Sequence, residues 1–194
     1  MQVVSIGALA AALVGLHQLL NPIKVVGAES PIPGYGVDIL QWKVEVAPGQ
    51  TEVLNGTVQQ VYQQILHINP KFQLGDTHLR SRGVQPQRRT PIHCNIWETG
   101  FRWALQDGIN YLRGVGGVPS NGPGPGNFGQ VSCSWSSAIW WCNDSPSPKT
   151  LGSWDMIADS AQVILDSCFP IDDTIAGQNF ESGNWSTIAR GNDC

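Results

Sequence analysis

The sequence V-S-C-S-W-S-S-A-I-W-W-C at residues 131–142 decides the fold of this chain. Apolar residues alternate along its two halves, which predicts a β-hairpin that turns at Ser136-Ser137. The positions expected on one face are Val131, Cys133 and Trp135 in the first strand and Ala138, Trp140 and Cys142 in the second. Cys133 and Cys142 are therefore predicted to lie close enough across the strand pair to form a disulfide.

A helix is expected on each side of this hairpin. The apolar face of the first, within residues 98–113, is Phe101, Leu105, Ile109 and Leu112, and that of the second is Ile157, Ala161, Ile164 and Cys168. These spacings of three and four residues are typical of amphipathic helices. Cys168 ends the second helix on its inward face and Cys94 lies just before the first, so we predict a second disulfide between them. Trp185, Thr187 and Ala189 alternate in a last strand.

The N-terminal part contributes a strand and a helix. Alternating apolar residues near the end of residues 35–46 predict a half-buried strand. Asn55-Gly56-Thr57 supplies a helix N-cap, and the helix is expected to stop near Asn69-Pro70.

Residues 1–28 have the features of a secretory signal peptide. An apolar run is followed by Val26-Gly27-Ala28, a small-residue cleavage site. We predict cleavage after Ala28, which gives a secreted, extracellular protein without stable membrane insertion. The alternative is an uncleaved membrane anchor.

The dibasic pair Arg88-Arg89 is a candidate processing site for a kexin-like protease. Cleavage there would make residues 29–89 a pro-segment and residues 90–194 the core domain; the alternative is a solvated loop. Residues 29–89 carry six basic and five acidic side chains, net +1, and residues 90–194 carry four basic and ten acidic ones, net −6. A nucleic-acid partner is not expected for so acidic a core.

Five cysteines and three sequons fit an oxidising compartment. The cysteines include no CxxC pair, which argues against zinc, and their odd number leaves one thiol over. The candidate glycosylation sites are Asn55, Asn143 and Asn184.

Three strings carry a resemblance to a known group: I-N-Y-L-R-G-V-G-G-V-P-S-N-G-P-G-P-G-N, L-G-S-W-D-M-I-A-D-S-A-Q-V-I-L-D-S-C and W-S-T-I-A-R-G-N-D-C, with the hairpin between them. They resemble small secreted cysteine-containing proteins of filamentous fungi, effector-like and mostly without assigned activity. The resemblance implies a sixth cysteine where this chain has Phe128, and Cys194 as the thiol left free. The order helix, hairpin, helix, strand is also similar to the α/β-sandwich of smut-fungus killer toxins and necrosis-associated effectors. We therefore expect an α+β fold, a small disulfide-stabilised sandwich with an N-terminal strand-helix segment.

No catalytic set stands out. His93 adjoins Cys94, but a thiol in an oxidising compartment is normally bridged, and sequence neighbours on an extended chain point apart. Carboxylates that could form a hydrolytic pair are Asp144, Asp155, Asp159, Asp166, Asp172 and Asp173. The glycine-proline loop at residues 116–127 lacks the GK[ST] of a phosphate cradle. No cofactor or metal is implied.

Tryptophan is abundant after Arg89, where seven of the eight lie. Trp140 and Trp141 must point to opposite faces of the hairpin, so one of them is a candidate binding surface and the alternative is packing. The expected function is effector- or toxin-like binding of an extracellular protein or glycan without catalysis. The alternatives are a carbohydrate-active enzyme or carbohydrate-binding module that uses Trp and Asp residues, and a cell-wall-associated structural protein.

Overall fold

A computed structural model describes residues 29–75 and 91–194. The signal peptide with its cleavage at Ala28, and the processing site at Arg88 and Arg89, lie outside the described residues and stay predictions. Within the described part, three helices and several sheets form a small α+β fold, the class expected from the sequence.

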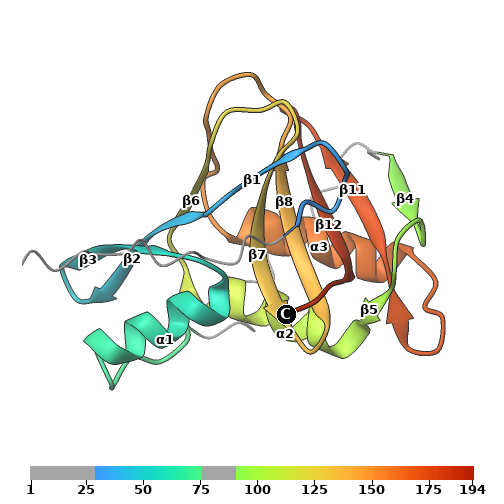
Figure 1. Cartoon of the computed structure of the whole chain (residues 1–194). Helices are drawn as coiled ribbons and strands as arrows, with labels where there is room; N and C mark the ends of the chain where they lie inside the picture. The colour runs from blue at the N-terminus through green and yellow to red at the C-terminus, as the bar shows by residue number, and fades with distance from the viewer. Residues whose placement is uncertain (1–28, 76–90) are drawn as a thin grey trace, which may run out of the picture.

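The largest sheet has six strands in the order β1-β7-β8-β12-β11-β4 (Figure 1). Their bounds are β1 Gly36–Asp38, β7 Asn127–Ser134, β8 Ser137–Asn143, β12 Trp185–Gly191, β11 Gly177–Glu181 and β4 Ile92–Cys94. β1 runs parallel to β7, and every other neighbouring pair in this sheet is antiparallel. The predicted hairpin is thus the centre of a larger sheet.

The hairpin turn lies one residue earlier than predicted. Trp135 and Ser136 form it, with φ angles of 50° and 53°, and Ser134 pairs with Ser137. A two-residue turn with both central residues left-handed matches the twist of the strands. An irregularity between Gln130 and Ser132 then shifts the remaining register.

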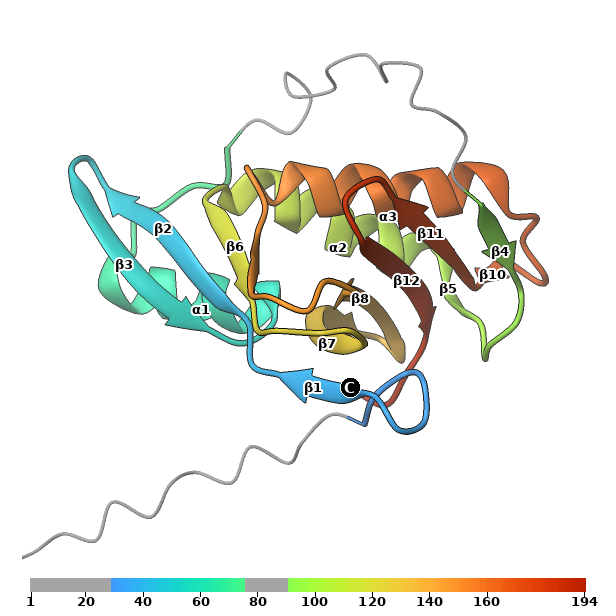
Figure 2. The same cartoon turned by 90° about the horizontal axis from the view of Figure 1, so that it is seen from above.

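Three helices accompany the sheets: α1 Val58–Ile68, α2 Arg102–Val115 and α3 Asp155–Ser167. α2 and α3 lie side by side against one face of the six-stranded sheet (Figure 2). At α1, Thr57 is the N-cap in a complete capping box with Gln60, and Asn69 is the C-cap, as the sequence predicts.

The second sheet takes two of its four strands from the N-terminal part. It has the order β3-β2-β6-β9, with β3 Gln50–Asn55, β2 Gln41–Ala47, β6 Val118–Asn121 and β9 Lys149–Thr150. A two-stranded sheet joins β5 Gly100–Phe101 to β10 Thr174–Ile175. The single strand predicted over residues 35–46 is therefore divided between β1 and β2, and each part joins a different sheet.

The N-terminal part shares its core with the rest of the chain. Trp42 on β2 is fully buried and stacks on Trp154, with ring centroids 3.4 Å apart and planes 14° apart. Leu40, Val44 and Val46 are buried in the same cluster as the inward faces of α2 and α3. Segment 29–75 is thus part of the main hydrophobic core.

Both faces of the six-stranded sheet are covered. Trp141 belongs to the large cluster on the helix side, and Trp140 belongs to a smaller cluster on the opposite side, around Phe128 and Ile188. Both indoles are fully buried. They point to opposite faces as predicted, but the candidate binding surface at Trp140 and Trp141 is wrong, because Ile32, Val37 and Trp97 pack against the second face.

Two disulfides fasten the fold. Cys94 is joined to Cys168, the predicted pair, with a Cα–Cα distance of 5.5 Å. Cys133 is joined to Cys194 instead of Cys142, with a Cα–Cα distance of 5.4 Å. The predicted Cys133–Cys142 bridge and the free thiol at Cys194 are both wrong, and Cys142 is the free, buried cysteine.

The strand register explains this pairing. Cys133 lies opposite Ala138 on β8, while Cys142 lies opposite Phe128. Beyond β12 the chain stays beside the hairpin turn, where the Asn192 amide donates to the Ser136 carbonyl over 3.2 Å. This contact brings the following residues, including Cys194, back to Cys133.

Candidate functional site

Three aromatic side chains form an exposed cluster, which we call the aromatic surface: Phe101, Trp103 and Trp135. Their exposed fractions are 44%, 44% and 70%. The rings of Phe101 and Trp103 have centroids 6.0 Å apart, and those of Trp103 and Trp135 are 5.7 Å apart. Most large apolar side chains of residues 29–75 and 91–194 are buried, so three exposed rings joined through Trp103 are a candidate binding site.

Ser137 holds the two halves of the aromatic surface together. Its hydroxyl accepts a hydrogen bond from the Phe101 amide over 2.8 Å and donates one to the Trp135 carbonyl over 3.0 Å. The start of α2 is thereby tied to the hairpin turn. The ring positions consequently depend on backbone that is fixed by hydrogen bonds.

The rings of the aromatic surface are not coplanar. Phe101 and Trp103 differ by 29°, and Trp103 and Trp135 differ by 56°. The three rings therefore do not form one flat stacking platform.

The apolar periodicity of the sequence does not predict the aromatic surface. The apolar spacing predicts Phe101 on the inward face of its helix, but Phe101 is the N-cap of α2 and lies outside the buried stripe of that helix. The alternating pattern predicts Trp135 within a strand, but Trp135 is a turn residue with positive φ. A bulky residue at such a turn position is a signal that sequence reasoning could have used.

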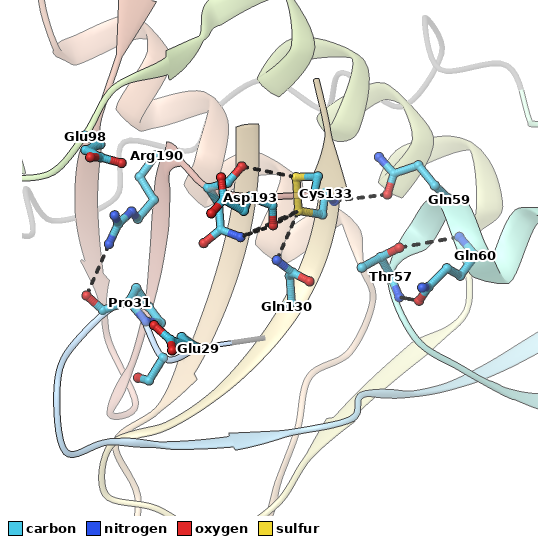
Figure 3. A pocket seen from close by; sticks show the side chains of 13 residues that line it. Glu29, Pro31, Thr57, Gln59, Gln60, Glu98, Gln130, Cys133, Arg190 and Asp193 are labelled. Atoms are coloured by element: carbon cyan, nitrogen blue, oxygen red, sulfur yellow. Dashed lines mark hydrogen bonds between the residues drawn. A yellow bond between two sulfur atoms is a disulfide. The ribbon is translucent and has the colours of Figure 1, made fainter. Parts of the chain in front are cut away.

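A second feature is a polar cleft of about 650 Å³, shown in Figure 3. Its lining residues come from the first described residues, the start of α1, the loop before β5, β7, the end of β12 and the chain beyond it. They are Glu29, Ser30, Pro31, Thr57, Gln59, Gln60, Glu98, Gln130, Cys133, Arg190, Asn192, Asp193 and Cys194. In this view Cys133 lies between Gln59 on one side and Arg190 on the other.

Several groups of the polar cleft are held in place. The Gln59 side chain accepts from the Cys133 amide over 3.2 Å and donates to the Ser132 hydroxyl over 2.8 Å. Arg190 donates to the Pro31 carbonyl through Nη1 over 3.3 Å and to the Gly191 carbonyl through Nε over 2.8 Å. The cleft is therefore bounded by fixed side chains.

The candidate catalytic groups are dispersed. None of the six aspartates singled out in the sequence lines the polar cleft. Asp159 on α3 pairs with Arg113 over 2.9 Å. Cys94 is disulfide-bonded, as the argument against a Cys/His nucleophile expects, and His93 packs against Phe180.

Cys142 is the one free thiol, and it is buried. Its Sγ lies 3.2 Å from Oδ1 of Asp144. Burial, and then the negative charge of Asp144, raise the pKa of the Cys142 thiol well above its usual range. The thiol therefore stays protonated and is a poor nucleophile.

The three sequons differ in accessibility. Asn55 and Asn184 are exposed, and glycosylation there stays a prediction. Asn143 is fully buried on β8, where its amide donates to the Gly122 and Ser147 carbonyls and accepts from the Ser145 amide. A glycan at Asn143 is incompatible with these contacts, so that prediction is wrong.

Comparison of the chain with protein-family models, curated proteins and solved structures finds no match. In residues 29–75 and 91–194, no group of three or more His, Cys, Asp or Glu side chains is arranged to hold a metal ion. No helix of the described part is long and apolar enough to cross a membrane. Any functional argument therefore depends on the two surfaces described above.

Proposed function

We propose that this protein is a secreted, effector- or toxin-like binding protein that acts without catalysis through the aromatic surface. The single observation that carries the proposal is the exposed contact of Phe101, Trp103 and Trp135. Tryptophan-rich clusters supply much of the binding energy at protein interfaces. The two disulfides support an oxidising, extracellular environment.

We propose that the partner is an extracellular protein that packs an apolar side chain against the exposed faces of these rings. The carbohydrate alternative would need an aromatic ring beside an acid in a cleft. The polar cleft contains acids, but none of the three exposed rings lines it. The protein partner is therefore the better-supported class.

A displayed peptide library selected against the folded protein tests this proposal. We expect selected peptides with apolar anchors, and we expect Trp135→Ala to weaken their binding at least tenfold, as loss of an interface hot spot does. Phe169→Ala is the matched control, since Phe169 is 86% exposed but forms no ring contact with the cluster.

A glycan array with the same variants tests the alternative. Glycan binding that depends on Trp135 would overturn the assignment to a protein partner. Equal peptide binding by wild type and Trp135→Ala would remove the aromatic surface as the site.

A further inference from the structure

The Cys133–Cys194 disulfide lies in the wall of the polar cleft. Both cysteines line the cleft, and Cys194 is exposed. Figure 3 shows the sulfur–sulfur bond among the side chains that line the cleft. The cleft volume of about 650 Å³ is in the range of pockets that admit small molecules, roughly 300–1,000 Å³, so a small thiol can reach this bond.

The Cys94–Cys168 disulfide is protected by comparison. Cys168 is only 4% exposed and belongs to the main hydrophobic core. Burial blocks attack on Cys168, and attack on Cys94 would leave a Cys168 thiolate among apolar side chains, where a thiolate is unfavourable. Thiol–disulfide exchange requires access and a stabilised leaving thiolate, so the two disulfides are expected to differ in reactivity.

The sulfur of Cys133 is surrounded mainly by hydrogen-bond donors. The Gln130 amide donates to Cys133 Sγ over 3.1 Å (Figure 3), and the Asn192 side-chain amide lies 3.9 Å from the same sulfur. One acceptor, the Asp193 carbonyl, lies 3.8 Å away, and it already accepts from the Asn192 amide over 2.7 Å. Because hydrogen-bond donors stabilise a thiolate, Cys133 is a favourable leaving group.

The sulfur of Cys194 has the opposite surroundings. The Asn192 carbonyl lies 3.5 Å from Cys194 Sγ, and the Ser137 carbonyl lies 3.6 Å from it. Carbonyl oxygens disfavour negative charge on a sulfur beside them. An attacking thiolate is therefore expected to bond to Cys194 and to release Cys133.

We propose that Cys133–Cys194 is an exchange site for an external dithiol, which attacks at Cys194. In the first step a thiolate of the dithiol bonds to Cys194 Sγ, the Cys133–Cys194 bond breaks, and Cys133 leaves as a thiolate that takes a proton from water. In the second step the other thiolate of the dithiol attacks the dithiol sulfur of this mixed disulfide, releases Cys194 and closes the dithiol's own disulfide. Two electrons pass from the dithiol to the protein. This site is independent of the proposed function of the aromatic surface.

Timed reduction of the folded full chain by dithiothreitol, followed by N-ethylmaleimide and mass spectrometry of each cysteine, tests the proposal. We expect Cys133 and Cys194 to be labelled at least tenfold faster than Cys94 and Cys168. Cys142 is free and buried, so its lack of labelling shows that the protein stays folded.

A monothiol tests the direction of attack, because it stops at the mixed disulfide. With limiting 2-mercaptoethanol, we expect the adduct on Cys194 and N-ethylmaleimide on Cys133. Gln130→Met removes the amide donor and is expected to slow the release of Cys133 about threefold. Gln73→Met is the matched control and should react as wild type, since Gln73 is exposed and lies outside the cleft.

The contrary outcomes are equally specific. Equal reduction rates of the two disulfides, or labelling of Cys133 only together with Cys142, would overturn the exchange site. An adduct on Cys133, or an unchanged rate in Gln130→Met, would overturn the direction of attack. None of these measurements reads peptide binding, so they give the same result whether or not the aromatic surface binds a partner.

Discussion

At the scale of single residues, the strand register changes which cysteine lacks a partner. The expected resemblance to fungal secreted proteins implies a cysteine at the position of Phe128. On that expectation, Cys194 is the cysteine that lacks a disulfide partner. In the structure Phe128 lies directly opposite Cys142, and Cys194 is already bonded to Cys133. Cys142 is therefore the free cysteine, and a cysteine at position 128 would lie opposite it.

We predict that Phe128→Cys forms a third disulfide, with Cys142. Directly opposite residues on antiparallel strands have Cα separations that a disulfide accepts. The new disulfide is expected to raise the free energy of unfolding by about 2–3 kcal/mol, and loss of the buried Phe128 ring is expected to lower it by about 3 kcal/mol. The net free energy of unfolding should therefore change little. Thiol titration of the unfolded, unreduced protein should find one thiol in wild type and none in the variant. Phe128→Ser, the control, should keep one, and two thiols in Phe128→Cys would contradict the register.

At the scale of elements, sequence periodicity predicts the features that are determined by residues close together in the chain. The inward faces of the two helices, apart from Phe101, the Thr57 cap and the existence of the hairpin follow from residues close together in the chain. The turn position and the Cys133 partner do not, because an irregularity after Gln130 and the return of the chain beyond β12 decide them. Likewise, burial of Trp140 depends on residues near Ile32 and Trp97, which no local pattern relates to the hairpin.

At the hairpin turn, the residues that would make the protein most stable differ from the Trp135 that the proposed binding needs. Trp135 and Ser136 both have positive φ, which costs a non-glycine residue about 1 kcal/mol or more. We predict that Ser136→Gly raises the free energy of unfolding by about 1 kcal/mol in urea titrations and leaves peptide binding intact. Trp135→Asn with Ser136→Gly, the preferred Asn-Gly turn, should be more stable still and should lose binding. An unchanged urea midpoint for Ser136→Gly would show that the turn is not strained.

At the scale of the whole molecule, the N-terminal segment and the rest of the chain are joined by packing. β1 pairs with β7, β2 pairs with β6, and the Trp42 ring stacks on Trp154. All five cysteines lie after Arg89, so no disulfide links the two parts. After processing at Arg88-Arg89, the two pieces of the chain would therefore be held together only by their shared hydrophobic core and paired strands.

We predict that cleavage after Arg89 yields a two-chain protein that stays associated. The full chain, treated with a kexin-like protease, should elute from a native sizing column as one species and resolve into two pieces in denaturant. Trp42→Ala removes a buried, stacked indole, which costs about 3–5 kcal/mol, so the cut variant should dissociate or unfold while the uncut variant is less affected. Gln50→Ala, on the exposed start of β3, is the control and should behave as wild type. Release of the N-terminal piece from cut wild type would mean that this segment acts as a removable pro-segment, because its contacts would then be too weak to hold it without the covalent chain.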